Sequence, residues 1–437
     1  MERNEFTRRR KRLMDIMNIG SIAILPASQV RNRNNDVDYQ YRQDSDFYYL
    51  SGFPEPEAVA VLIPDRKHGE FILFCREKDP ESEIWHGRRS GLQKAIEYYG
   101  ADDAFPISDL DEILPGLIEN KERVYYNMGI DHDFDVHVQE WVNQVRGKAR
   151  TGVTAPEEFI SLGHALHELR LYKSRGEIKA MRRAAKISAK AHAIAMKKCK
   201  PGMKEYQIES ELLHEFMKEG CRSSAYPSIV GGGANGCILH YTENSDPLND
   251  GELLLIDAGA EHDYYASDIT RTFPINGQFS KEQKIAYEIV LAAQEAAIKK
   301  VQPGNHWNDP HEAAVREITI GLKEMGLLKG RLPTLLKEEA YKPYYMHRTG
   351  HWLGMDVHDV GDYKVGGEWR LLEPGMVMTV EPGLYIAEHT RGVAKKWWNI
   401  GIRIEDDVLV TKSGHDVLSK DAPKTVAEIE SIMDHAN

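Results

Sequence analysis

The first part of the chain alternates short apolar runs with amphipathic stretches. Apolar runs bounded by turn-forming residues predict strands, whereas apolar positions three and four residues apart predict helices. Strands that alternate with helices are typical of an α/β domain. We therefore expect an α/β domain over residues 1–172. Its predicted strands lie at 21–27, 58–63, 70–74 and 123–127, and its predicted helices at 90–99 and 133–145.

The N-terminal residues predict one more helix, because Phe6, Leu13, Met14 and Met17 form a single apolar stripe. The basic residues at 8–12 are then expected to form its solvent-facing side. This stretch lacks the apolar core of a secretory signal.

The second part of the chain, residues 173–437, begins with a strong helix signal. Ser174 and Glu177 have the spacing of a capping box. That helix is expected to end at Pro201, and a second helix, with apolar positions four residues apart, to end at Gly220.

The same arrangement follows once more. Ser280 and Gln283 begin a third helix, and a fourth has Asp309 as its expected N-cap and Pro310 at its first position. Two helices followed by two extended segments therefore occur twice, and we interpret this as a structural duplication around a shared central sheet.

An acidic residue lies in or directly after each extended segment of the two repeats. Along a strand, side chains alternate between faces, so the expected second strand of the first repeat places Asp268 and Thr270 on one side. One alternative is that these acids only face solvent, including an acidic run at 405–407. The four acids are Asp257 after 253–256, Asp268 within 264–272, Glu381 after 376–380 and Glu405 within 401–410.

Composition narrows the possible functions. The 437 residues carry a net charge of −12, which argues against sequence-independent binding to nucleic acid. No stretch approaches the ~20 apolar residues of a membrane span. The four cysteines include no CxxC pair and are expected to be reduced thiols of a cytoplasmic protein.

Four converging carboxylates would repel one another, and two divalent cations would relieve that repulsion. Carboxylates together with an imidazole suit Mn²⁺, Zn²⁺, Co²⁺ or Fe²⁺. The segment from His347 to His351 is not the H-E-x-x-H helix of zinc proteases, because Arg348 occupies the position of the glutamate. A pair of metal ions ~3.5–4 Å apart can supply a hydroxide nucleophile and polarise a carbonyl.

Asp257, Asp268, His351, Glu381 and Glu405 occur in the ligand order of the dinuclear metallopeptidases with the pita-bread fold. The chain resembles this family, and within it aminopeptidase P, the Xaa-Pro aminopeptidases. The segments that carry this resemblance are HYTEN (240–244), DITRTFP (268–274), HWLGMDVHDVG (351–361), EPGMVMTVEPGLY (373–385), GIRIEDD (401–407) and, in the N-terminal part, YRQDSDFYYLSGFPEPEA (41–58).

The resemblance implies an α+β pita-bread catalytic domain over 173–437 and a smaller, creatinase-like α/β domain over 1–172. It implies two Mn²⁺ ions per subunit, with Zn²⁺ or Co²⁺ possible, and a hydroxide that bridges them. The implied metal ligands are Asp268 and Glu405 for both ions, Asp257 for one ion, and His351 and Glu381 for the other.

Further roles follow from the same resemblance. Glu381 would accept a proton, His240 and His358 would contact the substrate around the scissile bond, and His347 would line the same pocket. Tyr385 and Arg403 would support these residues through hydrogen bonds. Asp36 and Trp85 of the N-terminal domain would reach the amino end of the substrate, across a subunit boundary in a homo-oligomer, a dimer or tetramer. Arg348 replaces a glycine that is often found in the family.

Three functions are consistent with the sequence. The first is an aminopeptidase that releases the N-terminal residue from peptides with proline at position 2. The second is a prolidase limited to Xaa-Pro dipeptides, and the third is a metal-free pita-bread binding module. All five ligand positions are occupied by metal-binding residue types, which disfavours the third.

Overall fold

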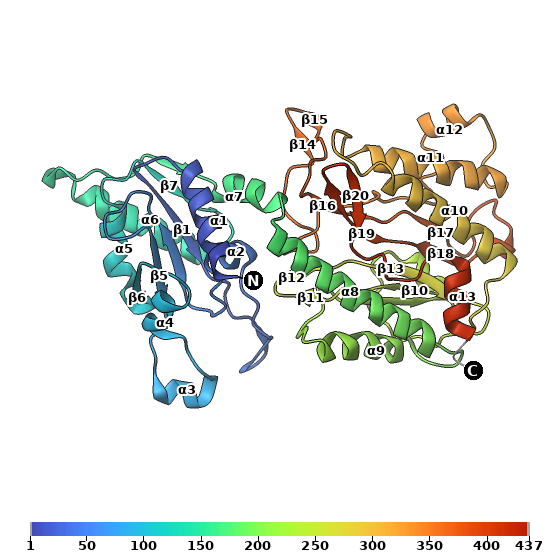
Figure 1. Ribbon diagram of the computed structural model, residues 1–437, viewed down its shortest axis with the longest axis horizontal. Coiled ribbons are helices and arrows are strands. Elements are labelled where there is room, and N and C mark those ends of the chain that lie inside the picture. Colours follow the sequence, from blue (N-terminus) through green and yellow to red (C-terminus); the bar gives the residue numbers. More distant parts are fainter. Residues whose placement is uncertain (1, 435–437) are drawn as a thin grey trace. The chain divides into compact units, whose positions relative to one another are not determined.

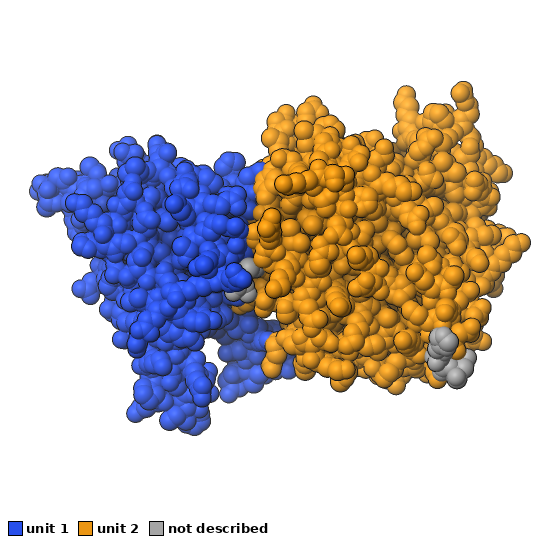
Figure 2. All heavy atoms as spheres, in the orientation of Figure 1, with its two compact units in different colours: residues 1–169 blue, residues 170–437 orange. Residues whose placement is uncertain are grey.

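The computed structural model of the protein describes residues 2–434. The chain divides into two compact units, Met1–Leu169 and Arg170–Asn437, which Figure 2 shows in different colours. Across the described residues, no helix has both the length and the apolar character that crossing a membrane would need.

A six-stranded mixed sheet forms the centre of unit 1 (Figure 1). Its strand order is β6-β5-β4-β1-β7-β8, and β1 pairs antiparallel with β4 and parallel with β7. Apolar side chains of the sheet and of α5 and α6 form the core of this unit. The strands are β1 Ser21–Pro26, β4 Val59–Leu62, β5 Phe71–Cys75, β6 Asp103–Pro106, β7 Arg123–Tyr125 and β8 Glu158–Ile160.

The helices of unit 1 include the predicted N-terminal helix, the two predicted between the strands, and others that were not predicted. They are α1 Arg3–Ile16, α2 Ser45–Ser51, α3 Pro80–His86, α4 Gly91–Glu97, α5 Leu110–Ile118, α6 His132–Gly147 and α7 Leu162–Leu171. Asp36 lies between the short exposed strands β2 Asn32–Asn34 and β3 Val37–Asp38, and Trp85 of α3 is 82% exposed.

The expectation that the basic residues of α1 all face solvent is wrong for two of them. Arg9 and Arg10 are buried, and their guanidinium groups lie over the rings of Tyr49 and Phe71, 4.0 and 4.1 Å from the ring centroids. They also donate hydrogen bonds to the carbonyl oxygens of Tyr49 and Leu50 near the end of α2. A guanidinium can be buried in this way because it is planar and because its donors reach carbonyls that the short helix leaves free.

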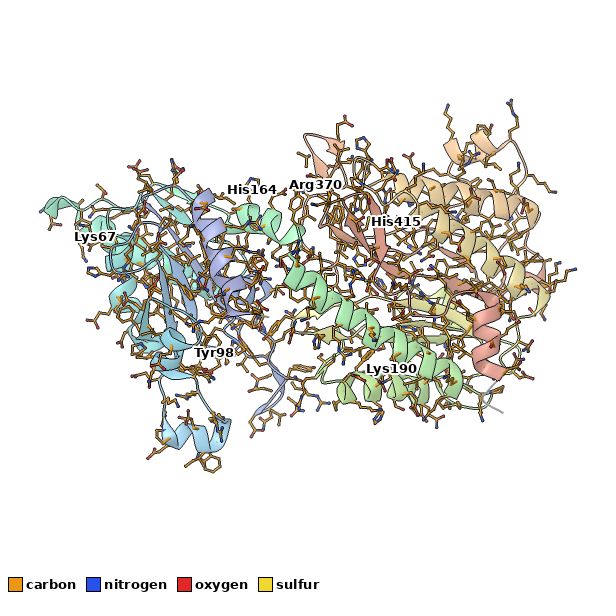
Figure 3. The ribbon with its side chains drawn as sticks, viewed as in Figure 1. Lys67, Tyr98, His164, Lys190, Arg370 and His415 are labelled. Atoms are coloured by element: carbon orange, nitrogen blue, oxygen red, sulfur yellow. The ribbon has the colours of Figure 1, made fainter. Side chains whose placement is uncertain are left out.

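Unit 2 contains two pairs of packed helices, which in the view of Figure 1 lie on either side of its strands. The predicted capping boxes at Ser174 and Ser280 both form. Lys190, labelled in Figure 3, joins the first pair by ion pairs with Glu215 and Glu219. The helices are α8 Arg175–Lys198, α9 Glu205–Lys218, α10 Lys281–Ile298, α11 Asp309–Glu324, α12 Leu332–Lys337 and α13 Val426–Asp434.

The predicted N-cap of α11 is wrong by one residue. Asn308 is the residue that flanks the helix, and Asp309 is its first residue. Asp309 instead accepts a hydrogen bond from the backbone amide of His306, which precedes the helix.

The strands of unit 2 form small sheets rather than one continuous ladder. The largest have the orders β13-β10-β9 and β16-β19-β20, and β17 pairs with β18. The two repeats meet where the Thr272 hydroxyl bonds to both backbone groups of Arg403. The strands are β9 Ile229–Gly232, β10 Leu253–Asp257, β11 Glu261–His262, β12 Tyr265–Ala266, β13 Thr270–Pro274, β14 Lys364–Val365, β15 Glu368–Trp369, β16 Val377–Val380, β17 Gly383–Ile386, β18 Ile400–Arg403, β19 Asp406–Thr411 and β20 Gly414–Val417.

Two acids that were expected within strands lie just outside them. Asp268 precedes β13, because the chain first makes a side hairpin, β11–β12, whose turn residues Asp263 and Tyr264 have positive φ of 51° and 68°. Glu405 lies between β18 and β19, where the chain leaves one small sheet for the next. Because neither residue is held in a ladder, each side chain is free to turn toward the centre of the unit.

Candidate metal centre and active site

The five predicted ligands line one cavity of about 330 Å³ inside unit 2. They reach it from positions at or beyond the ends of strands, where the backbone is no longer confined to a ladder. Asp257 ends β10, Asp268 precedes β13, Glu381 follows β16, Glu405 separates β18 from β19, and His351 lies in the loop before β14.

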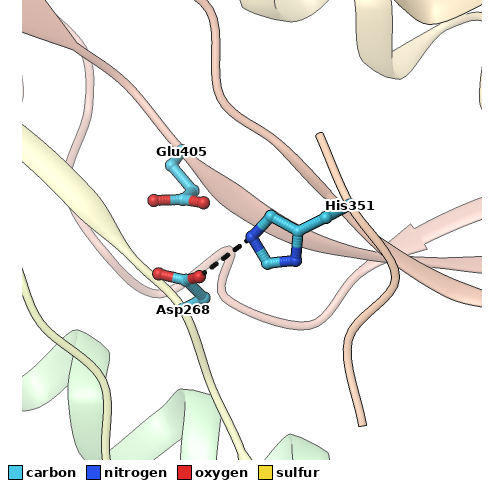
Figure 4. Close-up of side chains that lie close together, drawn as sticks. All are labelled: Asp268, His351 and Glu405. Atoms are coloured by element: carbon cyan, nitrogen blue, oxygen red, sulfur yellow. Dashed lines mark ion pairs between the residues drawn. The ribbon is translucent and has the colours of Figure 1, made fainter. Parts of the chain in front are cut away.

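Asp268, His351 and Glu405 form the tightest group (Figure 4). Each offers one ligand atom, and these atoms lie within 4.8 Å of one another. His351 Nε2 is 3.3 Å from Asp268 Oδ2 and 3.7 Å from Glu381 Oε1. Asp257 is connected through Tyr226, whose hydroxyl lies 2.7 Å from Asp257 Oδ1 and 2.5 Å from Asp268 Oδ1.

Backbone hydrogen bonds hold the ligands in place beyond the strand ends. The amide of Glu405 donates to the carbonyl of Thr270 at 3.1 Å, and the amide of Glu381 donates to the carbonyl of Thr349 at 2.8 Å. The Thr270 hydroxyl also donates to Glu405 Oε2 at 2.6 Å. The two repeats are therefore tied together at the same residues that present the carboxylates.

The carboxylates disturb one another electrostatically. Burial, reinforced by the neighbouring carboxylates, raises the pKa of Glu405 well above its ordinary value. Burial raises the pKa of Glu381 to about 7. It also raises the pKa of Asp257, even though the Arg403 guanidinium lies 2.6 Å from that carboxylate.

His351 and Asp268 form an ion pair within this group. Although burial alone would lower it, the hydrogen bond to Asp268 and the charge of Glu381 raise the pKa of His351 to about 9. For Asp268 the effects are reversed. Burial alone would raise its pKa, but the hydrogen bond from His351 lowers it. The pair shows that a positive charge is favoured at the position between these side chains.

These residues fit a divalent metal site. Buried carboxylates are rare unless they are paired or bind metal. Arg403 forms an ion pair with Asp257, which neutralises one of the four carboxylates. Carboxylate oxygens with one imidazole nitrogen are the donor set of Mn²⁺, Zn²⁺ or Co²⁺ sites. Cations at the centre would offset both the cost of burying Glu381 and Glu405 as charged groups and the repulsion among the carboxylates.

A chain of hydrogen bonds runs from Arg403 to His347. Arg403 donates to the Tyr385 hydroxyl oxygen at 3.1 Å. His347 Nδ1 lies 2.7 Å from the carbonyl oxygen of Arg348 and must donate to it, so Nε2 accepts from the Tyr385 hydroxyl at 2.9 Å. Burial, together with the charge of Arg403, lowers the pKa of His347 to about 3, so its ring is neutral near pH 7.

The remaining histidines form the exposed side of the cavity. His240 and His358 both line it, and the His358 ring lies 4.4 Å from the His351 ring, edge to face. Of the residues predicted for the site, all those in unit 2 are at or next to this cavity. Asp36 and Trp85 belong to unit 1, and their predicted roles stay predictions.

Two residues at the centre had no signal in the sequence. Tyr226 lies in a loop before β9, at no fixed spacing from the acids that it contacts. Asp407 is 1% exposed and accepts a hydrogen bond from the backbone amide of Asp268 at 3.1 Å. Asp406 and Glu405 are buried as well, so the alternative of a solvated acidic run at 405–407 is wrong.

Comparison with known proteins identifies the families that this chain matches. Residues 179–412 match the metallopeptidase family M24, and residues 6–125 match the aminopeptidase P N-terminal domain. The chain is 45% identical over 434 residues to an Xaa-Pro aminopeptidase of Escherichia coli K12, a match that covers 99% of this chain and 98% of that protein. It is 42% identical over 433 residues to the Xaa-Pro aminopeptidase of Haemophilus influenzae, a match that covers 99% of this chain and 98% of that protein.

Solved structures show the same fold over the whole chain. The aminopeptidase PepP of Pseudomonas aeruginosa superposes with a TM-score of 0.99 at 60% identity, covering 100% of this chain and 99% of that chain. Zinc-substituted E. coli aminopeptidase P in complex with product superposes with a TM-score of 0.97 at 45% identity, covering 100% and 99%. The predicted α+β pita-bread fold with a smaller α/β N-terminal domain is thereby confirmed.

Proposed function

This chain belongs to the metallopeptidase family M24, and from that premise we propose that it is a manganese-dependent Xaa-Pro aminopeptidase. It would release the N-terminal residue of a peptide whose second residue is proline. The observation that carries the proposal is the convergence of Asp257, Asp268, His351, Glu381 and Glu405 on one cavity. The names of the relatives, which match nearly the full chain, support the choice of substrate.

Two Mn²⁺ ions per subunit are part of the proposal, with Asp268 and Glu405 shared, Asp257 on one ion, and His351 and Glu381 on the other. When bound, such a pair supplies a bridging hydroxide as nucleophile at neutral pH and polarises the scissile carbonyl. Zn²⁺ or Co²⁺ are alternatives, and zinc is present in one relative of the same fold.

The side chains of the protein would then move protons and hold the peptide. Glu381, with His347 Nδ1 at 3.8 Å and His351 Nε2 at 3.7 Å, would accept the proton that the nucleophile loses. His240 and His358, on the exposed side of the cavity, would contact the peptide around the scissile bond. Neutral His347, fixed by Tyr385 and Arg403, would line the same pocket without adding charge.

Proline suits a site of this kind. An Xaa-Pro bond is a tertiary amide without an N–H, so a peptidase that grips an extended backbone through that group loses the contact. A site that polarises the carbonyl and packs the pyrrolidine ring does not need it. This reasoning applies equally to an Xaa-Pro dipeptidase, which is therefore the second candidate.

A substrate series tests the proposal. Purified protein with added Mn²⁺ is given an Xaa-Pro dipeptide, an Xaa-Pro-Xaa tripeptide and an Xaa-Ala-Xaa tripeptide, and release of the first residue is measured. The proposal predicts release from the Xaa-Pro-Xaa tripeptide, little from the alanine analogue, and none by His351→Ala. Activity on the dipeptide alone would make the protein a prolidase, and a folded protein that neither binds metal nor cleaves any peptide would indicate a binding module.

We also propose that the protein forms a homo-oligomer in which Asp36 and Trp85 of one subunit reach the amino end of the substrate bound to a neighbouring subunit. Ile84 and Trp85 of α3 are 80% and 82% exposed, as expected of apolar residues that a partner covers. Sedimentation should show a dimer or tetramer, and Trp85→Ala should raise KM while the metal content stays unchanged. A monomer with full activity would contradict this part of the proposal.

A further inference from the structure

Helix α8 presents two fully buried polar side chains toward the metal centre, Ser188 and His192. They are four residues apart and therefore lie on the same face of the helix. A buried polar group is costly unless it is hydrogen-bonded, so the partners of these two residues indicate what they hold. Neither residue lines the cavity itself.

Ser188 joins the two chain segments that carry Asp257 and Asp268. Its Oγ accepts a hydrogen bond from the backbone amide of Ala260 at 2.9 Å and lies 2.6 Å from Ser267 Oγ. Ala260 follows Asp257 by three residues, and Ser267 directly precedes Asp268. A single hydroxyl thus connects the two segments to the same point on the helix.

His192 acts one turn further along α8. Its Nε2 lies 3.1 Å from the carbonyl oxygen of Ala258, which can only accept, so Nε2 carries the hydrogen. The amide of Ala258 in turn donates to the carbonyl of Ile269 at 3.1 Å. His192 is therefore bonded to the residue after Asp257, and that residue is bonded to the residue after Asp268.

The two segments pass so close to each other that no side chain fits between them at Gly259. A Cβ atom placed on Gly259 would lie 1.8 Å from the carbonyl oxygen of Ser267. Only glycine therefore fits at this position. Mutual repulsion of the carboxylates would push the segments apart.

We propose that Ser188 and His192 form a clamp that sets the separation of the Asp257 and Asp268 carboxylates and so determines the affinity of the centre for divalent cations. They are positioning residues, because they act through the backbone on either side of the ligands. The proposal rests on the metal-dependent function proposed above. Residues that orient metal ligands typically contribute 10–100-fold to metal affinity.

The test is calorimetric titration of metal-free protein with Mn²⁺, together with urea unfolding in chelator. His192→Leu fills the space of the ring but has no hydrogen-bond donor for the carbonyl of Ala258. His192→Gln keeps a donor that reaches about as far along the side chain. Ser188→Ala removes one oxygen atom and is the variant least prone to misfold. Ile187→Val is the matched control, because Ile187 is a buried neighbour on α8 that only packs in the core.

His192→Leu and Ser188→Ala should each weaken Mn²⁺ binding 10–100-fold, and His192→Gln should recover part of the loss. Ile187→Val should lower stability and leave the affinity within about twofold. Unchanged Mn²⁺ affinity in Ser188→Ala and His192→Leu, or losses that simply follow stability in all four variants, would overturn the clamp. Wild-type protein that binds Mn²⁺ but cleaves no Xaa-Pro-Xaa tripeptide would overturn the proposed function and leave the clamp standing.

Discussion

Tyr226 holds a single hydroxyl between two carboxylates, 2.7 Å from Asp257 and 2.5 Å from Asp268. Burial, reinforced by these two charges, raises the pKa of Tyr226 well above its ordinary value, so the hydroxyl keeps its proton. The hydroxyl has one hydrogen, so it donates to one of the two carboxylates at a time and lies between the two side chains. Tyr226 thus helps to hold the Asp257 and Asp268 side chains in position at the centre.

Tyr226→Phe should weaken Mn²⁺ binding about 10–100-fold, because the two carboxylates lose the group that orients them. Calorimetric titration measures the change. Tyr287→Phe is the control, since it also removes one tyrosine hydroxyl, but that hydroxyl donates to the carbonyl of Lys424, outside the centre. Equal affinities of Tyr226→Phe and wild type would show that the hydroxyl does not orient the ligands.

His192 should make stability depend on pH. Burial lowers the pKa of His192 from 6.5 to about 4. The charge of Arg271 lowers this pKa further, and the charge of Asp268 partly opposes the change. Between these values the unfolded chain binds a proton that the folded protein does not, so stability falls as pH falls. The free energy of unfolding of wild type and of His192→Gln is measured in chelator. The amount by which wild type is the more stable should decrease by about 3 kcal/mol between pH 7 and pH 4. An advantage that is constant with pH would contradict this assignment.

The sequence predicted that these five residues lie together, because the four acids occur at or near the ends of apolar runs. The resemblance singled out His351 and assigned all five as metal ligands, and that role stays a prediction. Tyr226, Ser188 and His192 were not found, because a residue that acts through a loop or a neighbouring helix has no fixed spacing from the ligand that it orients. Asp407 was considered only as part of a solvated acidic run, because local sequence does not show which acids are buried.

At the level of elements, the loop that carries His351 and His358 is anchored by a buried ion cluster. The carboxylate of Asp359, next to His358, forms ion pairs with Lys173 Nζ at 2.8 Å and with the Arg170 guanidinium at 2.6 Å. All three side chains are at most 3% exposed. Against the effect of burial, Lys173 and then Arg170 lower the pKa of Asp359, so the carboxylate stays charged. The start of unit 2 thereby fixes a loop of the candidate site that lies far along the chain.

Lys173→Met should destabilise the protein by about 3 kcal/mol, because it leaves part of a buried charge unpaired. Urea unfolding in chelator measures this loss. The matched variant is Lys198→Met, which removes a lysine whose side chain is 55% exposed and whose partner Glu211 is 25% exposed, and which should cost less than about 1 kcal/mol. Similar losses in the two variants would contradict the anchoring role of the buried cluster.

The sequence identified helices more accurately than strand ends. Capping boxes at Ser174 and Ser280 are local signals, and both helices begin where they indicate. The chain around Asp268 and Glu405 was expected to be continuous strand, yet it leaves the ladder in both places. Apolar alternation continues through such bends, so the pattern alone does not show where pairing stops.

At the level of the whole molecule, the chemistry is concentrated in unit 2. Every residue that lines the candidate metal centre comes from this unit. The alternation of strands and helices predicted an α/β N-terminal domain, and the repeated helix–helix–strand order predicted a duplicated second part. The pattern did not show how the repeats join, because their contact depends on side chains such as Thr272, which hydrogen-bonds the backbone of Arg403.

The central claim is that cleavage of an Xaa-Pro bond requires divalent metal at this centre. The most direct measurement is to remove metal with chelator, titrate the protein with Mn²⁺, and follow both bound metal and release of the first residue from an Xaa-Pro-Xaa tripeptide. No release is expected without metal, and the rate of release should rise to a plateau as two Mn²⁺ bind per chain. Full tripeptide cleavage by metal-free protein, or two bound Mn²⁺ without any cleavage, would contradict it.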